Sequence, residues 1–99
     1  MSYHVYILYS GSRDLFYVGV TNDLKKRLQQ HNSKESGFTA WGVPWILLWA
    51  TLKTSREEAE LLEKKLKNLS RVRKIRFIRK YREGIQDEEL WDDLVDRSH

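Results

Sequence analysis

The stretch YHVYILYSGSRDLFYVGV, residues 3–20, predicts a β-hairpin at the start of the chain. Residues 3–9 and 15–20 are rich in β-branched and aromatic side chains, which favour strands. Between them GSRD, residues 11–14, is typical of a turn. The first two elements of the fold are therefore expected to be adjacent antiparallel strands.

Alternation along the two strands assigns their side chains to opposite faces of the sheet. On the first strand Tyr6 shares a face with His4 and Leu8, and on the second Tyr17 shares a face with Gly19. If the hairpin pairs across the turn at 11–14, the phenol groups of Tyr6 and Tyr17 are expected on the same side of the sheet.

A short amphipathic helix is expected directly after the hairpin. Thr21 or Asn22 is the expected N-cap, because short polar side chains accept hydrogen bonds from the first free backbone N–H groups. Arg27 and His31 are four residues apart and so lie next to each other on this helix, beside its leucines. A loop, SKESG, follows at 33–37.

The remainder of the chain predicts one strand and three helices. The nearly continuous apolar run at 44–52 suits a strand that is buried on both faces. A helix is expected from Thr54 or Ser55 to about Asn68, because two acidic residues follow this start signal. DEELWDDLVD, residues 87–96, is expected to form a short terminal helix.

Between these two helices, Ser70 is expected to open a further helix that ends at Gly84. Its arginines are expected to face solvent, and four apolar or aromatic residues are expected to face the core: Val72, Ile75, Ile78 and Tyr81.

The element order β-β-α-β-α-α predicts an α+β (α/β) fold, a small three-stranded mixed or antiparallel sheet flanked by helices. With 99 residues, the chain has room for one domain. We expect this domain to cover residues 1–83, and an acidic C-terminal segment, residues 84–99, to pack on it as a short helix.

Charge is unevenly distributed around a net value of +4. Residues 56–82 hold eleven cationic side chains and four carboxylates, whereas residues 83–99 hold seven carboxylates and one arginine. A basic body of this kind favours a polyanionic partner, although a charge run taken alone is more typical of a solvated helix face.

Composition excludes several classes of protein. The chain has no cysteine, which excludes disulfides and thiolate metal sites. The first ten residues do not resemble a signal peptide, and the apolar run at 45–52 is too short to span a bilayer. These features predict a cytoplasmic protein without membrane contact.

Taken in order, these residues resemble the GIY-YIG nuclease superfamily. His4-Val5-Tyr6 and Tyr17-Val18-Gly19 stand where that family has its two tripeptides, although His4 replaces the first glycine. Residues matching the family's arginine, its histidine and its metal-binding glutamate follow, namely Arg27, His31 and Glu63.

The resemblance is closest to the small stand-alone UPF0213-type members. These pair a GFT sequence, here residues 37–39, with a basic run after the glutamate. They often carry an asparagine before a late tryptophan, where this chain has Glu88 and Glu89 before Trp91.

The resemblance implies a divalent-metal-dependent endonuclease that hydrolyses phosphodiester bonds in DNA with low sequence specificity. It implies a single Mg²⁺ or Mn²⁺ ion held by Glu63. The choice of Glu63 rests on the family pattern, because Glu58 flanks the apolar stripe of the same helix about as closely. Glu63 is also placed to form an ordinary ion pair with Lys67.

The resemblance also implies roles for the other residues. Arg27 would hold phosphate oxygens with its planar guanidinium, and Tyr17 would bond near the nucleophile. Tyr6 and His31 both remain candidates for the general base. A free phenol has a pKa of about 10, so Tyr6 needs nearby cations to lower it, whereas an unperturbed imidazole titrates near 6.5.

Contacts to the phosphate backbone are expected from the cationic helices, at Lys67, Arg71, Arg73, Lys74 and Arg76. The alternative function is a nucleic-acid-binding adaptor with the same fold and weak or no catalysis. Single-stranded, duplex and structured DNA, RNA as a substrate, the oligomeric state and the biological pathway all stay open at this stage.

Overall fold

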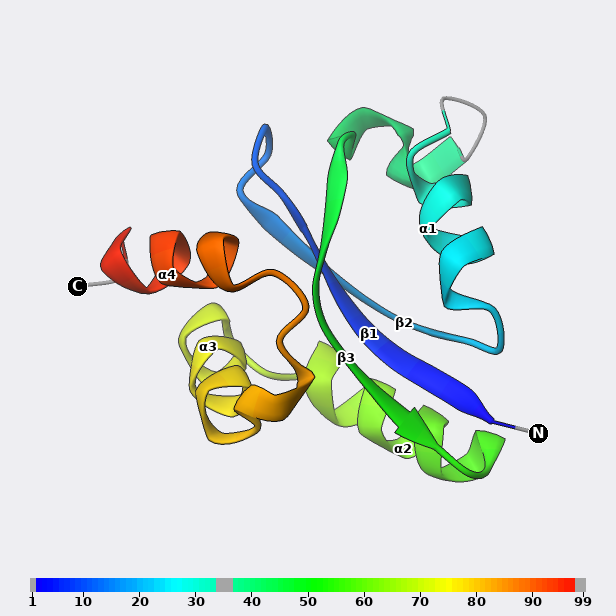
Figure 1. Ribbon diagram of the computed structural model, residues 1–99. Coiled ribbons are helices and arrows are strands. Elements are labelled where there is room, and N and C mark those ends of the chain that lie inside the picture. The colour runs from blue at the N-terminus through cyan, green and yellow to red at the C-terminus, as the bar shows by residue number, and fades with distance from the viewer. Residues whose placement is uncertain (1, 34–36, 98–99) are drawn as a thin grey trace.

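The computed structural model describes residues 2–33 and 37–97, which are organised around a three-stranded sheet (Figure 1). The strands are β1 (Tyr3–Ser10), β2 (Leu15–Thr21) and β3 (Trp45–Lys53), and they lie in the order β2-β1-β3. Both pairings are antiparallel. The expected hairpin and three-stranded sheet are confirmed, and the sheet is antiparallel throughout.

The helical elements follow the expected order, with two short 3₁₀ segments added. They are α1 (Leu24–His31), η1 (Gly37–Gly42), α2 (Arg56–Lys67), α3 (Arg71–Lys80), η2 (Arg82–Gly84) and α4 (Glu88–Arg97). Part of the loop expected at 33–37, residues 34–36, lies outside the described residues. Within the described ranges, no helix combines the length and apolar character needed to cross a bilayer.

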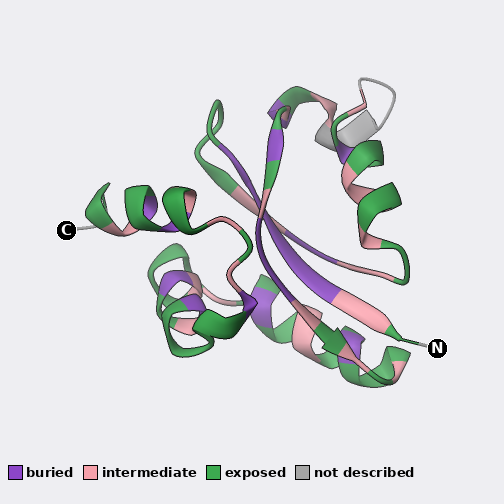
Figure 2. Cartoon of the chain, viewed as in Figure 1, coloured by how far each residue is buried: buried purple, intermediate pink, exposed green. Residues whose placement is uncertain are grey.

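The central strand β1 separates two packed layers. Its Val5 and Ile7 belong to an apolar core formed with α2, α3 and α4 on one face of the sheet. Tyr6 and Leu8 belong to a second, smaller cluster on the other face, against which the leucines of α1 pack. Figure 2 shows that β1 is buried along most of its length. The predicted alternation of side chains is confirmed, and both faces of the sheet are covered.

The N-cap of α1 differs from the prediction. Asp23 caps this helix, and its carboxylate accepts a hydrogen bond from the Lys26 N–H at 3.1 Å. Thr21 still belongs to β2, and its hydroxyl accepts a hydrogen bond from the Asp23 N–H at 3.0 Å. The expectation of Thr21 or Asn22 was wrong because the strand runs further than the residue pattern suggests. Ser55 and Ser70 do cap α2 and α3, as expected.

Burial of β3 also differs from the prediction for the run at 44–52. Leu48 and Trp49 are buried, but Ile46 and Leu52 are exposed. The reason is the strand order, which makes β3 an edge strand and leaves β1 as the strand that is buried on both faces.

On α3, two of the four residues expected to face the core do so. Ile75 and Ile78 are buried, whereas Val72 is 64% exposed and Tyr81 is 38% exposed. Val72 lies in the first turn, where it lines an open cavity rather than the core. Tyr81 is the C-cap and has left the helical conformation, so it no longer follows the period of the helix.

Gly84 does not end α3 as expected, because the helix ends at Lys80 and Gly84 closes the following turn η2. A Cβ atom on Gly84 would lie 2.4 Å from Nε1 of Trp49 and 2.7 Å from the carbonyl oxygen of Ala50. The Trp49 indole cannot easily move, since it is buried and donates a hydrogen bond to the carbonyl oxygen of Tyr81 at 2.9 Å. Gly84 is therefore a packing requirement between β3 and the chain that leads to α4.

We expect Gly84→Ala to destabilise the fold by about 1–3 kcal/mol, the usual range for an overpacked site. Gly11→Ala is the matched control, because a Cβ atom there would meet its nearest neighbour, on the Tyr9 ring, only at 4.0 Å. Urea unfolding followed by tryptophan fluorescence measures both variants. Equal stabilities would contradict the packing role of Gly84.

Candidate active site

The position of Tyr6 depends on the absence of a side chain at Gly19. The two residues are cross-strand partners in the β1–β2 register. A Cβ atom on Gly19 would lie 2.4 Å from the Tyr6 hydroxyl oxygen and 2.5 Å from its Cζ. The phenol ring therefore lies against the bare backbone of β2, in space that any other residue at position 19 would fill.

Three rings from separate elements meet on this face of the sheet. The ring centroids of Tyr6 and Tyr17 are 6.4 Å apart, those of Tyr6 and His31 are 5.9 Å apart, and those of Tyr17 and His31 are 4.6 Å apart. The Tyr6 hydroxyl oxygen lies 2.9 Å from Nε2 of His31, within hydrogen-bond distance. Both Tyr6 and His31 are 1% exposed, so this hydrogen bond is shielded from bulk solvent.

Burial shifts the pKa values of Tyr6 and His31 in opposite directions. It raises the pKa of Tyr6 to about 12, an effect that the Arg27 guanidinium partly opposes. Burial, assisted by the positive charge of Arg27, lowers the pKa of His31 to about 4. At neutral pH the pair is a protonated phenol beside a neutral imidazole. The phenol pKa is thus raised, not lowered as a simple base role for Tyr6 requires.

Arg27 is the charged member of this group. It is partly buried, and its hydrogen bond to the Tyr6 hydroxyl is the main reason that its own pKa is raised, with a further contribution from Tyr17. Its Nη1 also donates to Oε1 of Gln30 at 3.1 Å, which holds the side chain along α1. The Tyr6 hydroxyl can donate to Nε2 of His31 when the neutral imidazole carries its proton on Nδ1.

Glu63 approaches this group from the other side of the sheet. It lies on α2, which packs on the face opposite Tyr6, next to the edge strand β2. Its side chain is 24% exposed, and its carboxylate is 3.2 Å from Nζ of Lys67. The negative charge of Glu63 contributes to the raised pKa of Tyr6, so the two groups are within electrostatic range across the edge of the sheet.

The surroundings of Glu63 offer oxygen ligands. Glu63 lines a cavity of about 480 Å³ together with Thr21 and Asn22 at the end of β2, and with Glu60 one turn earlier on α2. Glu58, the competing acid on α2, is exposed and is not among the described residues that line this cavity. The cavity thus favours Glu63 over Glu58, although Glu60 lines it as well and pairs there with Arg56.

These donors fit a magnesium ion bound by one carboxylate. Within residues 2–33 and 37–97, no three His, Cys, Asp or Glu side chains are grouped as a metal cage. Mg²⁺ takes oxygen ligands, keeps several of its waters and needs only one or two carboxylates. The Glu63 carboxylate, the Thr21 hydroxyl and the Asn22 amide are donors of that type.

The five cationic residues expected at the phosphate backbone have different local surroundings. Lys67 pairs with Glu63, and Nζ of Lys74 donates to the carbonyl oxygen of Leu69 at 2.6 Å. Arg73 is exposed on α3. Arg71 and Arg76 instead line a second cavity, near the β1–β2 turn.

Two residues that contribute to these sites were not identified as such from the sequence. Gly19 was noted for its face of the strand and as part of a tripeptide, but its steric role needs the cross-strand register. Arg97 was counted with the acidic C-terminal segment, yet it lines the same cavity as Arg71. For Arg97, the signal present in the sequence was a single arginine at the end of an otherwise acidic helix.

Comparison with known proteins identifies the family. The GIY-YIG catalytic domain model matches residues 2–85. The chain is 37% identical over 86 residues to a UPF0213 protein of Bacillus licheniformis, a match that covers 85% of this chain and 88% of that protein. It is 35% identical over 80 residues to a UPF0213 protein of Streptococcus pneumoniae, covering 79% of this chain and 81% of that protein.

A solved structure agrees with these sequence matches. The solution NMR structure of a UPF0213 protein from Bacillus halodurans is 33% identical to this chain and superposes with a TM-score of 0.53, over 79% of this chain and 83% of that one. The matched region contains both tripeptides, Arg27, His31 and Glu63. The chain therefore belongs to the GIY-YIG nuclease family, among relatives of the UPF0213 type.

Proposed function

We propose that this protein is a divalent-metal-dependent endonuclease that hydrolyses phosphodiester bonds in DNA with low sequence specificity. The observation that carries the proposal is the buried hydrogen bond between the Tyr6 hydroxyl and a neutral His31, with the Arg27 guanidinium at the same hydroxyl. Burying polar groups costs free energy, and a surface that only binds nucleic acid has no need of such a pair.

The pair suits the transfer of a proton from water. In the proposed step the attacking water gives a proton to the Tyr6 oxygen, while the hydroxyl proton of Tyr6 moves to Nε2 of His31. The hydroxide so formed attacks phosphorus, and the bond between phosphorus and the leaving oxygen breaks. The leaving oxygen takes up a proton from solvent, and His31 then releases its extra proton to restore the starting state. The raised pKa of Tyr6 does not obstruct this step, because the phenol passes a proton on and is never required to stay ionised.

In this scheme Arg27 acts on the substrate, and Tyr17 positions His31. The Arg27 guanidinium lies at the phenol oxygen, next to where the phosphate must sit, and neutralises charge on the phosphate oxygens. Tyr17 packs against the His31 ring at 4.6 Å and keeps the imidazole facing Tyr6. The two residues thereby hold phosphate, water and proton acceptor in line.

Glu63, with Thr21 and Asn22 beside it, would hold the Mg²⁺ ion. A bound Mg²⁺ supplies Lewis-acid stabilisation of the charge that develops on the phosphoryl oxygens. The ion pair of Glu63 with Lys67 holds the carboxylate in the absence of metal, and Lys67 is exposed enough to release it.

We expect Glu63→Gln to lower cleavage by on the order of 10²–10³-fold, the loss typical when one charge-stabilising group is removed. Binding of the same DNA in EDTA should stay unchanged. Plasmid, single-stranded, duplex and branched DNA and an RNA of matched length are the substrates, each assayed with Mg²⁺, with Mn²⁺ and with EDTA. Glu58→Gln is the matched control, since it removes an exposed carboxylate from the same helix.

Two results would argue against this assignment. Cleavage by Glu63→Gln at the wild-type rate would remove Glu63 as the metal ligand. A wild-type protein that cleaves none of these substrates, but binds them in a salt-sensitive manner, would support the nucleic-acid adaptor instead.

The neutral state of His31 predicts a specific dependence of stability on pH. Below the ordinary histidine pKa of 6.5 the unfolded chain binds a proton at His31, whereas the folded chain does not until about pH 4. The contribution of His31 to the free energy of unfolding is therefore fully present above pH 6.5 and is lost as the pH falls towards 4. The loss amounts to up to about 3 kcal/mol, at 1.36 kcal/mol for each pKa unit.

His31→Gln keeps a side chain that can accept a hydrogen bond from the Tyr6 hydroxyl but does not take up a proton in this pH range. Urea unfolding at pH 7 and at pH 4.5 should show a smaller loss of stability for this variant than for the wild type. Other titrating groups are common to both proteins and cancel in the difference. Parallel pH profiles would show that His31 is not held neutral by burial.

A further inference from the structure

A second cavity gathers arginine side chains away from the candidate active site. It has a volume of about 600 Å³ and opens between the β1–β2 turn, α3 and α4. Its described lining contains one carboxylate, Asp14, and four arginines: Arg71, Arg76, Arg79 and Arg97. The remaining described lining residues are the aliphatic Val72, Ile75 and Val95.

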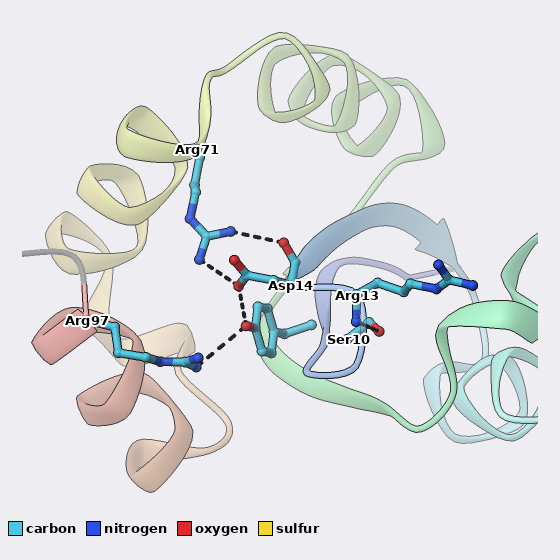
Figure 3. A network of polar contacts seen from close by, with 6 residues as sticks. Ser10, Arg13, Asp14, Arg71 and Arg97 are labelled. Atoms are coloured by element: carbon cyan, nitrogen blue, oxygen red, sulfur yellow. Dashed lines mark hydrogen bonds and ion pairs between the residues drawn. The ribbon is translucent and has the colours of Figure 1, made fainter.

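Asp14 occupies one end of this cavity and engages Arg71. Nη2 of Arg71 lies 2.9 Å from Oδ1 of Asp14, and Nη1 donates to the Asp14 backbone carbonyl at 3.1 Å. The Tyr9 hydroxyl donates to the same carboxylate oxygen, and Nη2 of Arg97 lies 3.5 Å from that hydroxyl. Figure 3 shows Arg71 reaching Asp14 from one helix and Arg97, on another helix, reaching the tyrosine hydroxyl that contacts Asp14, while Arg13 points away from them.

This arrangement leaves the cavity strongly positive. Four guanidinium groups face a single carboxylate, and the Asp14–Arg71 pair is open to solvent, with side chains 58% and 41% exposed. Exposed pairs of this kind are weak and exchange readily. Guanidinium groups bind phosphate through paired N–H donors, in the way that Arg71 here holds two oxygens of Asp14.

The cavity lies on the face of the sheet opposite the tyrosine–histidine pair. Ile75 of α3 and Tyr9 of β1 belong to the core on the α2–α4 face, whereas Tyr6 belongs to the cluster on the α1 face. The arginine cavity is therefore separate from the tyrosine–histidine pair, and its described lining shares no residue with that of the Glu63 cavity, so a phosphate held there is not the one that would be cleaved.

We propose that this cavity binds phosphate groups of a polynucleotide backbone, and that the Asp14 carboxylate holds Arg71 until a phosphate replaces it. The proposal rests on the proposed function for its ligand class. The described lining offers guanidinium groups and aliphatic side chains, with no aromatic ring on which a base could stack. Such a site recognises the backbone and not the base, which agrees with low sequence specificity.

The test compares three single variants with the wild type. Asp14→Asn removes the competing charge but keeps an oxygen that can accept from Tyr9 and Arg71. Asparagine also tolerates the positive φ of 53° found at this position. Arg79→Gln removes a cavity guanidinium outside the Asp14 network. Arg82→Gln is the matched control, because Arg82 is exposed just after the same helix and is not among the described lining residues.

Binding of a fluorescent single-stranded oligonucleotide is measured by anisotropy in EDTA, across a range of salt concentrations. Asp14→Asn should bind about threefold to tenfold more tightly than the wild type at low salt, because one repulsive charge is gone. Arg79→Gln should bind more weakly and lower the salt slope by about 0.7, the value for one lost contact to single-stranded phosphate. Arg82→Gln should show a smaller change, and thermal unfolding confirms that each variant is folded.

The proposal is wrong if Asp14→Asn binds no more tightly than the wild type, or if Arg79→Gln and Arg82→Gln lose affinity equally. Inorganic phosphate at matched ionic strength is the second probe. If its thermal stabilisation depends on Arg79 while oligonucleotide binding does not, the site takes free phosphate and the polynucleotide assignment fails. Because binding is measured without metal, a protein that cleaves nothing can still show the Asp14 effect, so the two proposals fail separately.

Discussion

The close approach of the Tyr6 ring to the backbone of Gly19 is the contact on which the candidate active site depends. Cross-strand register places the two residues opposite each other, and the missing Cβ lets the ring lie flat against β2. From that position the hydroxyl reaches His31 on α1, and Arg27 reaches the hydroxyl. A side chain at position 19 would displace the ring and separate all three groups.

The two faces of the sheet carry different kinds of side chains. On the face covered by α2, α3 and α4 it carries a conventional apolar core that extends to Trp91 and Leu94 of the last helix. On the α1 face the buried cluster includes a phenol, and an imidazole packs beside it, both kept uncharged by removal from water. The stability of the apolar face allows the other face to hold polar groups whose burial costs free energy.

Local residue patterns predicted most of the helices and strands. They gave wrong predictions where tertiary packing decides burial or helix ends. The hairpin, the serine caps of α2 and α3 and the last helix were all predicted from their own residues. The apolar run of β3 predicted burial on both faces, but an edge strand cannot be covered in that way, so Ile46 and Leu52 are exposed. Gly84 was predicted to end a helix, whereas in the structure its lack of a side chain leaves space for the Trp49 indole.

The sequence by itself determined which residues share a face and which family the chain resembles, because strand alternation, helical spacing and motif order are local properties. Tertiary structure alone decided the charge states and the long-range partners. The pKa values of Tyr6 and His31 follow from burial, which no local pattern reports. Glu63 comes within range of Tyr6 only because β2 is an edge strand, and Arg97 joins Arg71 around one cavity only because α4 folds back beside α3. Those arrangements depend on distances through space between segments far apart along the chain.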